Sequence, residues 1–344
     1  MDQVLRRLSG ALLPWYQQNK RDLPWRQDRD PYHIWVSEIM LQQTRVEAVK
    51  GYYTRFLAAL PTVAALAEAD DALLYKLWEG LGYYSRVRNL KKAARVIMDT
   101  HGGIFPATHQ QVLALPGIGD YTAGAICSIA FGQRTPAVDG NVLRLISRLQ
   151  ADDTPIDLPQ RKREVQALLS AVYPEAAGDF TQALMELGAT ICGPNRAPDC
   201  VQCPCQDFCL GYARGVSGQL PVKSPKKGRR LEEKTLFLLR CGDRYALQKR
   251  PDKGLLAGMW QLPEVMQLLE ADRALQALDL PVREIYRQLD RNHIFTHIEW
   301  KMRCFYLEVW SEDLKYQWFT EEEIEKTTAL PTAYRQFWDA REDF

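Results

Sequence analysis

The stretch LPGIGDYTAGA at residues 115–125, followed by VDGN at 138–141, decides the fold of the first part of this chain. Pro116 cannot extend a helical hydrogen-bond ladder, and Gly117 and Gly119 permit backbone angles that other residues resist. We therefore predict a helix, a glycine hairpin, a second helix, and a third helix that begins after the aspartate of VDGN. The hairpin would present bare N–H groups at a helix N-terminus, which is a suitable seat for a phosphate. An ordinary glycine turn fits the same letters, so other parts of the chain have to decide.

Most of the chain before residue 192 is predicted to be helical. Apolar residues recur at helical spacing, and residues that commonly begin helices, such as Thr108, precede some of these runs. Predicted helices cover residues 4–15, 32–53, 73–78, 85–100, 141–150, 159–172 and 177–191, with a short helix after Thr108. The segment LPWR at 23–26 is predicted to be an extended loop. The first two hundred residues are therefore expected to be helix and short loop.

The composition is ordinary for a globular protein with room for two domains. The chain has 344 residues, of which 46% are hydrophobic and 25% are charged. No apolar run approaches the roughly 18 residues that cross a bilayer, and the amino terminus lacks the apolar region of a signal peptide, so we expect a cytosolic protein that does not bind membranes. The formal net charge is only +1. Any binding of DNA must therefore rest on local charge.

The composition changes after residue 213. Residues 214–230 are basic and are punctuated by proline and glycine, which is typical of a linker. Beyond them, strands are predicted over 235–239, 245–247, 294–298 and 302–310, and helices over 321–326 and 333–342. We therefore predict a helical domain over residues 1–213 and an α+β domain over residues 231–344.

Four cysteines form a cluster with the spacing of a metal site. Cys192, Cys200, Cys203 and Cys209 are separated by seven, two and five residues in a polar, proline-containing loop. Four thiolates so placed can hold a tetrahedral zinc ion or a [4Fe–4S] cluster, and the spacing alone does not choose between them. Buried free thiols are the alternative to a metal site. Cys205 is a fifth cysteine in the loop, which neither a zinc ion nor a cluster held by the other four requires. Such a loop has little core of its own, so a metal is expected to organise it.

Glu38 is an acidic residue beside an apolar patch. It shares a helix face with Leu41 and Gln42 in an apolar and amide-rich segment, whereas an isolated glutamate on a helix is usually a solvated surface residue. A second candidate region, GLGYYSRVR at 80–88, interleaves glycines, tyrosines and arginines that could stack on bases and pair with phosphates. The same tyrosines could equally be core residues.

Taken together and in this order, these motifs resemble the helix-hairpin-helix DNA glycosylase superfamily, and within it the adenine DNA glycosylase (MutY) family, over nearly the whole chain. The matching segments are LPWR at 23–26, SEIMLQQT at 37–44, GLGYY at 80–84, the hairpin at 115–125 with Asp139, QALME at 182–186, the four cysteines, and FTH at 295–297 in the second domain. The resemblance implies an all-α helix-hairpin-helix glycosylase domain with an iron–sulfur loop, followed by an α+β Nudix-like domain.

The resemblance assigns the chemistry to two carboxylates. Cleavage of the N-glycosidic bond to adenine passes through an oxocarbenium-like sugar, so it needs an acid for the leaving base and a carboxylate for the cation. Glu38 in a closed pocket would have a raised pKa and act as acid and base. Asp139 caps the helix that starts at Gly140, where amide donors would keep it ionised, so it is the stabiliser, possibly through a transient covalent adduct. Tyr121 and Asn141 match positions that support Asp139 and the sugar.

The resemblance also assigns residues that hold the flipped base and the duplex. Arg26, Leu41, Gln182 and Glu186 are expected to line the adenine pocket, and Gln43 and Tyr83 to fill or wedge the base stack. Gly117 and Gly119, with a monovalent cation, would hold a backbone phosphate. The expected partner is double-stranded DNA that contains an 8-oxoguanine:adenine or guanine:adenine mispair, bound by a monomer associated with the nucleoid.

Tyr121 implies that strand cleavage is weak. Related bifunctional glycosylases that resemble endonuclease III have a lysine at this point of the hairpin, which forms a Schiff base with the sugar. A phenol cannot form one, so base removal without strong lyase activity is expected.

The second domain resembles a Nudix fold with an incomplete catalytic motif. Gly258 and Glu264 fit the opening of the Nudix box, but the later Arg-Glu and paired glutamates are replaced by DRALQA at 272–277. Little remains to hold magnesium. We expect a domain that reads 8-oxoguanine through Phe295, Thr296 and His297 rather than a hydrolase.

Three alternatives remain at this point, together with one departure from the family pattern. The alternatives are a glycosylase of the same superfamily for another base, such as thymine opposite guanine, a Nudix pyrophosphohydrolase, and a non-catalytic DNA-binding protein. The departure is the first cysteine gap, which has seven residues where the family implies six. The resemblance nevertheless implies a [4Fe–4S] cluster on the four cysteines.

Overall fold

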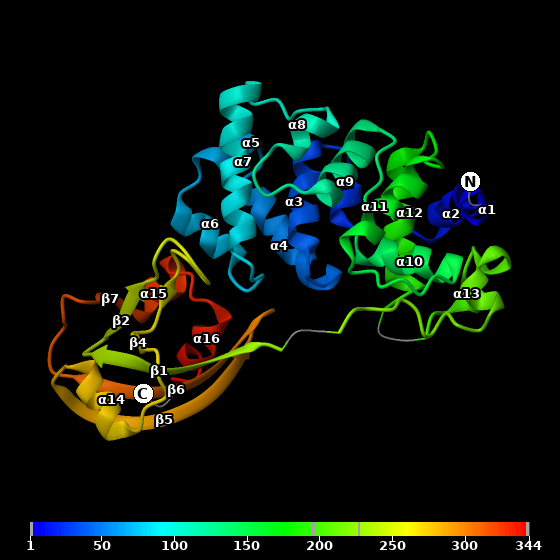
Figure 1. Ribbon diagram of the computed structural model, residues 1–344. Coiled ribbons are helices and arrows are strands. Elements are labelled where there is room, and N and C mark those ends of the chain that lie inside the picture. The colour runs from blue at the N-terminus through cyan, green and yellow to red at the C-terminus, as the bar shows by residue number, and fades with distance from the viewer. Residues whose placement is uncertain (1–2, 195–196, 226–227, 342–343) are drawn as a thin grey trace. The chain divides into compact units, whose positions relative to one another are not determined.

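The computed structural model describes residues 3–194, 197–225, 228–341 and 344 (Figure 1). The chain divides into two compact units. Unit 1 comprises Met1–Glu68 and Arg88–Pro225, and unit 2 comprises Ala69–Val87 and Lys226–Phe344. Among the described residues, no helix is long and apolar enough to cross a membrane.

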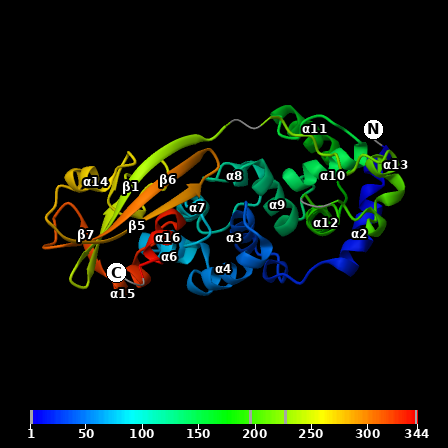
Figure 2. The same cartoon turned by 90° about the horizontal axis from the view of Figure 1, so that it is seen from below.

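Unit 1 is helical, as the sequence predicts. Its helices are α1 (Gln3–Arg6), α2 (Leu8–Asn19), α3 (Pro31–Leu41), α4 (Val46–Ala59), α5 (Val63–Glu68), most of α7 (Ser85–His101), α8 (His109–Leu113), α9 (Asp120–Phe131), α10 (Gly140–Gln150), α11 (Pro159–Ser170), α12 (Ala177–Thr190) and α13 (Leu210–Ala213). Helix α9 lies beside α3 and α12, and α10 also contacts α12 (Figure 2).

Two local predictions in unit 1 are wrong. The helix predicted over 32–53 is interrupted between α3 and α4, because Gln43 adopts a left-handed φ of 58° that breaks the i to i−4 ladder. The turn is closed by a bond from Thr44 N–H to the Leu41 carbonyl (3.3 Å). The LPWR segment is a short 3-10 helix, η1 (Pro24–Arg26), rather than an extended loop, since proline is well suited to the first turn of a helix.

The glycine hairpin joins α8 to α9. Helix α8 is capped by Thr108, whose hydroxyl accepts a hydrogen bond from Gln111 N–H, and it ends at Leu113, before Pro116. The turn closes through Ile118 N–H to the Leu115 carbonyl (3.1 Å), with Gly117 at a φ of 78°. The predicted helix, hairpin and helix are confirmed.

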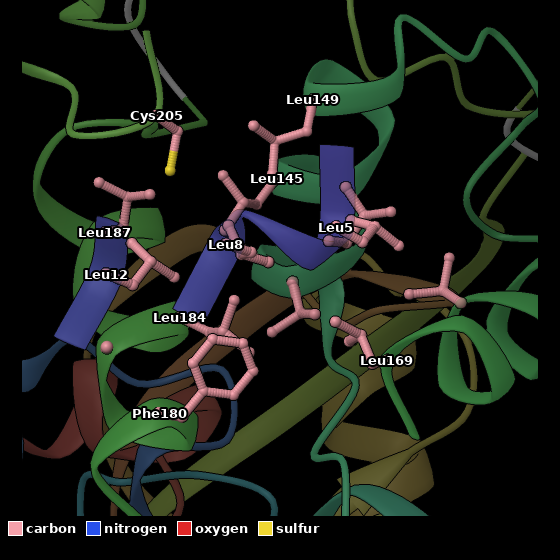
Figure 3. Packing of buried hydrophobic residues seen from close by; sticks show 14 of the residues in the cluster. Leu5, Leu8, Leu12, Leu145, Leu149, Leu169, Phe180, Leu184, Leu187 and Cys205 are labelled. Atoms are coloured by element: carbon pink, nitrogen blue, oxygen red, sulfur yellow. The ribbon is translucent and has the colours of Figure 1, made fainter. Parts of the chain in front are cut away.

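The core of unit 1 is built on the helices that carry the hairpin and its partners. Leu5, Leu8 and Leu12 from α1 and α2 face Leu145 and Leu149 from α10 and Phe180, Leu184 and Leu187 from α12 (Figure 3). These side chains are buried and make one continuous cluster. Cys205 belongs to this cluster and is completely buried in it.

Unit 2 is built around a seven-stranded mixed sheet. Its strands are β1 (Arg230–Cys241), β2 (Arg244–Lys249), β3 (Trp260–Gln261), β4 (Glu264–Val265), β5 (Val282–Ile294), β6 (Ile298–Val309) and β7 (Gln317–Thr320). The main path runs β3-β2-β1-β6-β5, with β1 and β6 parallel and the other pairs antiparallel. Helices α14 (Ala271–Leu278), α15 (Glu321–Thr327) and α16 (Thr332–Trp338) complete the unit, which is α+β as predicted.

Three details of unit 2 differ from the predictions. The strand predicted over 294–298 is the turn between β5 and β6. Strand β5 is not predicted, because it is an edge strand whose residues are mostly polar and exposed. Helix α16 ends at Trp338, and the predicted end at Glu342 lies outside the described residues, as do Lys226 and Lys227 of the linker.

The segment 69–87 groups with unit 2 although it is far from it in sequence. Helix α6 (Asp71–Trp78) contacts α15, and the Glu79 carboxylate accepts a hydrogen bond from Leu330 N–H (3.2 Å). The Arg335 guanidinium lies 3.8 Å from the same carboxylate. A domain division made at residue 213 of the sequence assigns residues 69–87 to the first domain. Their grouping with unit 2 cannot be seen in the sequence, because it depends on contacts between distant segments.

Candidate active site

One pocket of unit 1 gathers most of the residues singled out in the sequence. It has a volume of about 590 Å³ and is lined by parts of η1, α3, α9 and α12 together with the N-terminus of α10. The predicted site residues that line it are Arg26, Glu38, Leu41, Gln43, Gly119, Tyr121, Asp139, Asn141, Gln182 and Glu186.

Glu38 is a buried carboxyl group in this pocket. The residue is only 5% exposed, on the inner side of α3, and its Oε2 atom has no hydrogen-bond partner among the described residues. Burial raises the pKa of Glu38 to about 7, with the charge of Asp139 acting in the same direction; the hydrogen bond to Tyr121 and the charge of Arg26 act against it. A carboxyl group with this pKa can carry a proton near neutral pH and release it.

Tyr121 lies on the first turn of α9, next to Glu38. Burial raises the pKa of Tyr121 well above its ordinary value, and the neighbouring charges of Glu38 and Asp139 raise it further. The hydroxyl also lies 3.9 Å from the sulfur of Met185 on α12. Tyr121 is therefore a neutral phenol that can donate a hydrogen bond to a carboxylate in the pocket.

Asp139 caps α10, as its position before Gly140 predicts. Its Oδ1 atom accepts hydrogen bonds from Asn141 N–H (2.9 Å) and Val142 N–H (2.8 Å), and its Oδ2 atom accepts one from the Asn141 side-chain amide (2.6 Å). Three N–H donors and the N-terminus of an 11-residue helix therefore face this carboxylate.

Asn141 is itself held by Arg144, which lies one turn further along α10. The Arg144 Nη2 atom donates to the Asn141 side-chain oxygen (3.0 Å) and to the Gly188 carbonyl (2.9 Å), while its Nε atom donates to the Cys192 carbonyl (2.9 Å). The cap on Asp139 is thus connected through buried hydrogen bonds to the end of α12 and to the first cysteine.

Glu186, on α12, also lines the pocket. Its side chain has no exposed surface and accepts from Arg21 Nε (2.7 Å), Arg21 Nη2 (3.1 Å) and Arg26 Nη2 (2.8 Å). Burial alone would raise the pKa of Glu186, but the hydrogen bonds from Arg21 and Arg26 outweigh burial and lower it. Glu186 is therefore an ionised anchor for Arg26, with its own oxygens already engaged.

Two cations of the pocket were not found by sequence reasoning. Arg21 meets Glu186 from 165 residues away, and Lys162 enters the pocket lining from α11. The charges themselves are visible in the sequence, but nothing local indicates that these two residues line the pocket. Among the described residues that line this pocket, Lys162 is the single lysine.

The two hairpin glycines differ in what they require. A Cβ atom on Gly117 would lie 2.5 Å from the Asn89 Cβ, and the φ of Gly117 is 78°. Gly119 caps α9 at a φ of −104°, and a Cβ atom there would meet no atom within 4 Å. Gly117 is therefore required by the turn itself, whereas Gly119 leaves open space in front of the first N–H groups of α9.

The predicted residues of the second recognition site all lie in unit 2. Thr296 and His297 are exposed on the turn between β5 and β6, and Phe295 is half-buried at its base. Tyr83 is 46% exposed at a left-handed φ of 48°, and its hydroxyl lies 2.9 Å from the Thr296 hydroxyl. The structure thus brings Tyr83 and Thr296 together, a pairing that the sequence does not indicate.

The four cysteines expected to bind metal line one small apolar cavity beside α10. Cys192, Cys200, Cys203 and Cys209 all contribute to its wall, and Arg148 donates to the Cys192 sulfur (3.3 Å). Among the described residues, no three His, Cys, Asp or Glu side chains converge as ligands of a single metal ion. Four thiol groups are a donor set for either a zinc ion or a [4Fe–4S] cluster. Cys205 does not line this cavity, and its side chain lies in the leucine-rich core cluster, to which Cys192 and Cys209 also belong (Figure 3).

Glu264, the first glutamate of the incomplete Nudix box, is occupied by protein side chains. Its carboxylate accepts hydrogen bonds from Lys234 Nζ (2.7 Å), Arg250 Nη1 (3.2 Å) and the Tyr334 hydroxyl (2.8 Å). Two cations thus neutralise the one remaining carboxylate of the motif, which agrees with a domain that does not bind magnesium there.

Comparison with known proteins places both parts of the chain. The family model of HhH-GPD superfamily base excision DNA repair proteins matches residues 36–175, and the NUDIX domain model matches residues 235–340. The adenine DNA glycosylase of Homo sapiens is 36% identical over 397 residues, which covers 95% of this chain and 72% of that protein.

Solved structures agree with the helical fold. A thermostable thymine-DNA glycosylase superposes with a TM-score of 0.56 at 29% identity over 61% of this chain and 97% of its own. A trapped endonuclease III–DNA covalent intermediate gives a TM-score of 0.53 over 63% of this chain and 100% of its own; at 22% identity it shows the fold alone. The long match to the human protein, together with the paired HhH-GPD and NUDIX domains, shows that this chain belongs to the adenine DNA glycosylase family of base excision repair enzymes.

Proposed function

We propose that this enzyme removes adenine mispaired with 8-oxoguanine, or less well with guanine, by hydrolysing the N-glycosidic bond in duplex DNA. The observation that carries the proposal is the pair of carboxyl groups in one pocket with opposite surroundings. Glu38 is buried with one oxygen unpaired and a pKa raised to about 7, whereas Asp139 accepts three N–H hydrogen bonds. Hydrolysis through an oxocarbenium-like sugar needs one group of each kind.

The roles follow from these surroundings. The target adenine is flipped out of the helix into the pocket, where Arg26, Leu41, Gln182 and Glu186 surround it. Protonated Glu38 gives its proton to a ring nitrogen of the departing base and, once ionised, accepts a proton from the attacking water. Asp139 stabilises the sugar cation, with Tyr121 and Asn141 holding the carboxylates in place. Gln43 and Tyr83 are proposed to fill or wedge the base stack on the other strand.

Substitution of each carboxyl group tests these roles. In single-turnover assays of free adenine release from an 8-oxoguanine:adenine duplex, Glu38→Gln and Asp139→Asn should each lower the rate by about 10²- to 10⁴-fold. Glu47→Gln, at a glutamate with 76% side-chain exposure, is the matched control and should leave the rate unchanged. Full activity in Glu38→Gln would refute the assignment of the acid.

We propose that strand cleavage is weak because the hairpin carries Tyr121 rather than an amine. Borohydride reduction in the presence of substrate DNA should trap little covalent enzyme–DNA adduct. The pocket does contain one described lysine, Lys162, so the Lys162→Met variant completes the test. A strong adduct that disappears in this variant would contradict the proposal and identify Lys162 as the amine.

We propose that Cys192, Cys200, Cys203 and Cys209 bind a [4Fe–4S] cluster. The four cysteines line one cavity, which supports a shared metal site, and the resemblance to the family implies a cluster rather than zinc. When bound, the cluster would cross-link the cysteine loop to the end of α12. Iron and sulfide analysis of anaerobically purified protein tests the assignment, and zinc without iron would refute it.

The remaining assignments concern the DNA and its surroundings. Gly117 and Gly119, with a monovalent cation, are proposed to hold a backbone phosphate at the start of α9. Phe295, Thr296 and His297 are proposed to read 8-oxoguanine opposite the adenine. Thr296→Ala should therefore reduce the preference for 8-oxoguanine:adenine over guanine:adenine.

The enzyme is proposed to act as a monomer on DNA in the cytoplasm, where the nucleoid lies.

A further inference from the structure

The turn at 295–297 rests on a buried tryptophan. Trp300, on β6, is 1% exposed, and the Phe295 ring meets it edge to face with a centroid distance of 4.7 Å and an interplanar angle of 70°. The His293 ring also contacts the Phe295 ring, with a centroid distance of 4.5 Å. Phe295 is therefore held by two aromatic contacts, while the next residues, Thr296 and His297, are exposed.

Trp300 is in turn held by charged groups. Its Nε1–H donates to Glu232 Oε2 (2.7 Å), from the residue that pairs with Trp300 in the parallel β1–β6 register. The Lys234 ammonium lies 4.0 Å from the centre of the Trp300 ring, and its side chain is only 1% exposed. A desolvated cation at this distance attracts the face of an indole strongly.

Lys234 stays at this position because Glu264 pairs with it. The Lys234 ammonium donates to Glu264 Oε1 (2.7 Å), and the Arg250 guanidinium contacts the same carboxylate (3.2 Å) and lies 5.6 Å from the Trp300 ring centre. The residual carboxylate of the Nudix box thus has a structural use. It anchors two cations against the indole that supports the turn.

The backbone of the turn is fixed independently. Phe295 N–H donates to the Ile298 carbonyl (2.8 Å), and the His297 carbonyl accepts from Arg230 N–H (3.0 Å). The indole is part of the core of unit 2, where it also meets the Tyr334 ring at 5.8 Å, and it contacts the turn through Phe295. It sets where the Phe295 ring lies and hence how the exposed side chains next to it are presented.

We propose that Trp300, clamped by Glu232 and Lys234, is a positioning residue for discrimination between 8-oxoguanine and guanine. This inference rests on the proposed reading of 8-oxoguanine by residues 295–297. Trp300 does not touch DNA. It acts by keeping Phe295, and with it Thr296, in the orientation that the oxidised base requires.

The test compares single-turnover adenine excision at subsaturating enzyme on 8-oxoguanine:adenine and guanine:adenine duplexes. Trp300→Phe keeps an aromatic ring but removes the N–H donor and the wider face. It should lower the ratio of the two rates by about 3- to 10-fold, through a slower 8-oxoguanine:adenine reaction with the guanine:adenine rate unchanged. Glu232→Gln, which keeps an acceptor but removes the charge, should lower the ratio less. Trp310→Phe, at a tryptophan that is 67% exposed, is the matched control and should keep the ratio of the wild type.

The outcomes separate this inference from the proposal on which it depends. If Thr296→Ala keeps the wild-type ratio, residues 295–297 do not read the oxidised base and the proposed function fails in this respect. If Thr296→Ala lowers the ratio of the 8-oxoguanine:adenine rate to the guanine:adenine rate, but Trp300→Phe and Glu232→Gln keep the wild-type ratio, only the role of Trp300 is wrong. Equal losses on both duplexes in the Trp300 and Glu232 variants would show a merely structural tryptophan and would also overturn the inference. If Trp300→Phe does not fold, Glu232→Gln alone decides.

Discussion

At the scale of single residues, the two carboxyl groups show how surroundings divide one chemistry into two roles. Glu38 is buried in the pocket, and burial is the largest cause of its raised pKa. Asp139 is the same functional group, but it lies at a helix N-terminus and is surrounded by N–H donors. Both positions follow from the backbone, since one residue is inside α3 and the other precedes α10.

The raised pKa of Glu38 predicts the pH dependence of both activity and stability. Glu38 must be protonated to act as the acid, so the single-turnover rate should fall about tenfold for each pH unit above pH 7. Because folding raises this pKa from 4.5 to about 7, the contribution of Glu38 to stability is complete below about pH 4.5 and is lost as the pH rises through 7.

The Glu38→Gln variant separates these effects. It should be more stable than the wild type at about pH 8, by roughly 3 kcal/mol, and gain little at about pH 4.5, as measured by urea unfolding at each pH. The variant Glu47→Gln should show no such pH-dependent difference, since Glu47 is exposed. A stability gain of Glu38→Gln that is the same at both pH values would contradict the raised pKa.

At the scale of elements, the hairpin combines a conformational requirement with a binding surface. Gly117 satisfies the turn between α8 and α9, and Gly119 caps α9 without a side chain. Each function needs a glycine for a different reason: the first for its φ, the second for free access to the helix N-terminus.

Alanine substitutions distinguish these two requirements. Gly117→Ala forces a Cβ atom onto Asn89 at a positive φ, and it should destabilise the enzyme by about 1–3 kcal/mol. Gly119→Ala should change the stability by less than about 1 kcal/mol but weaken binding to DNA of any sequence. Thermal unfolding and titration of an undamaged duplex measure the two effects. Equal destabilisation by both substitutions would show that the two glycines have one common role.

The cysteine loop makes a similar distinction possible. Cys203 lines the cavity, whereas Cys205, two residues later, is completely buried and is not part of the lining. If the four cysteines bind the cluster, Cys203→Ala should lose most of the iron, and Cys205→Ala should keep it at some cost in stability from a lost buried sulfur. Iron content per chain and the visible absorption of the purified variants check this. Retention of iron by Cys203→Ala would show that another residue replaces it.

At the scale of the whole molecule, the linear order of domains is not the order of compact units. Residues 69–87 follow unit 1 in sequence but belong to unit 2, where Glu79 contacts Leu330 and Arg335. The chain therefore passes from unit 1 to unit 2 after Glu68 and returns to unit 1 at Arg88, before it reaches the linker.

Truncation tests this grouping. A chain that ends at Pro225 removes the partners of residues 69–87, so trypsin should cleave faster after Lys76 and Arg86 in the truncated chain than in the full one. Cleavage after Arg134, which lies in unit 1, should be unchanged and is the internal control. Mass spectrometry of the early fragments identifies the sites, and equal protection of residues 69–87 in both chains would contradict the grouping.

Some of the site could be predicted from residues that are close together in the sequence. The hairpin, the capping role of Asp139 and the cysteine loop depend on the geometry of a few consecutive residues, and all three lie where expected. The predictions failed where a segment depends on distant neighbours. The break between α3 and α4 at Gln43 and the edge strand β5 are examples.

The sequence by itself determined the type of each functional group: a phenol instead of an amine at Tyr121, a capping carboxylate at Asp139, and a broken Nudix box after Glu264. Only the tertiary structure decided which of these groups meet. It placed Tyr121 beside Glu38, joined Arg21 to Glu186 across 165 residues, and set Lys234 against Trp300. The physical reason is that turns and caps are made by neighbouring backbone groups, whereas desolvation and ion pairing depend on which distant segments exclude water together.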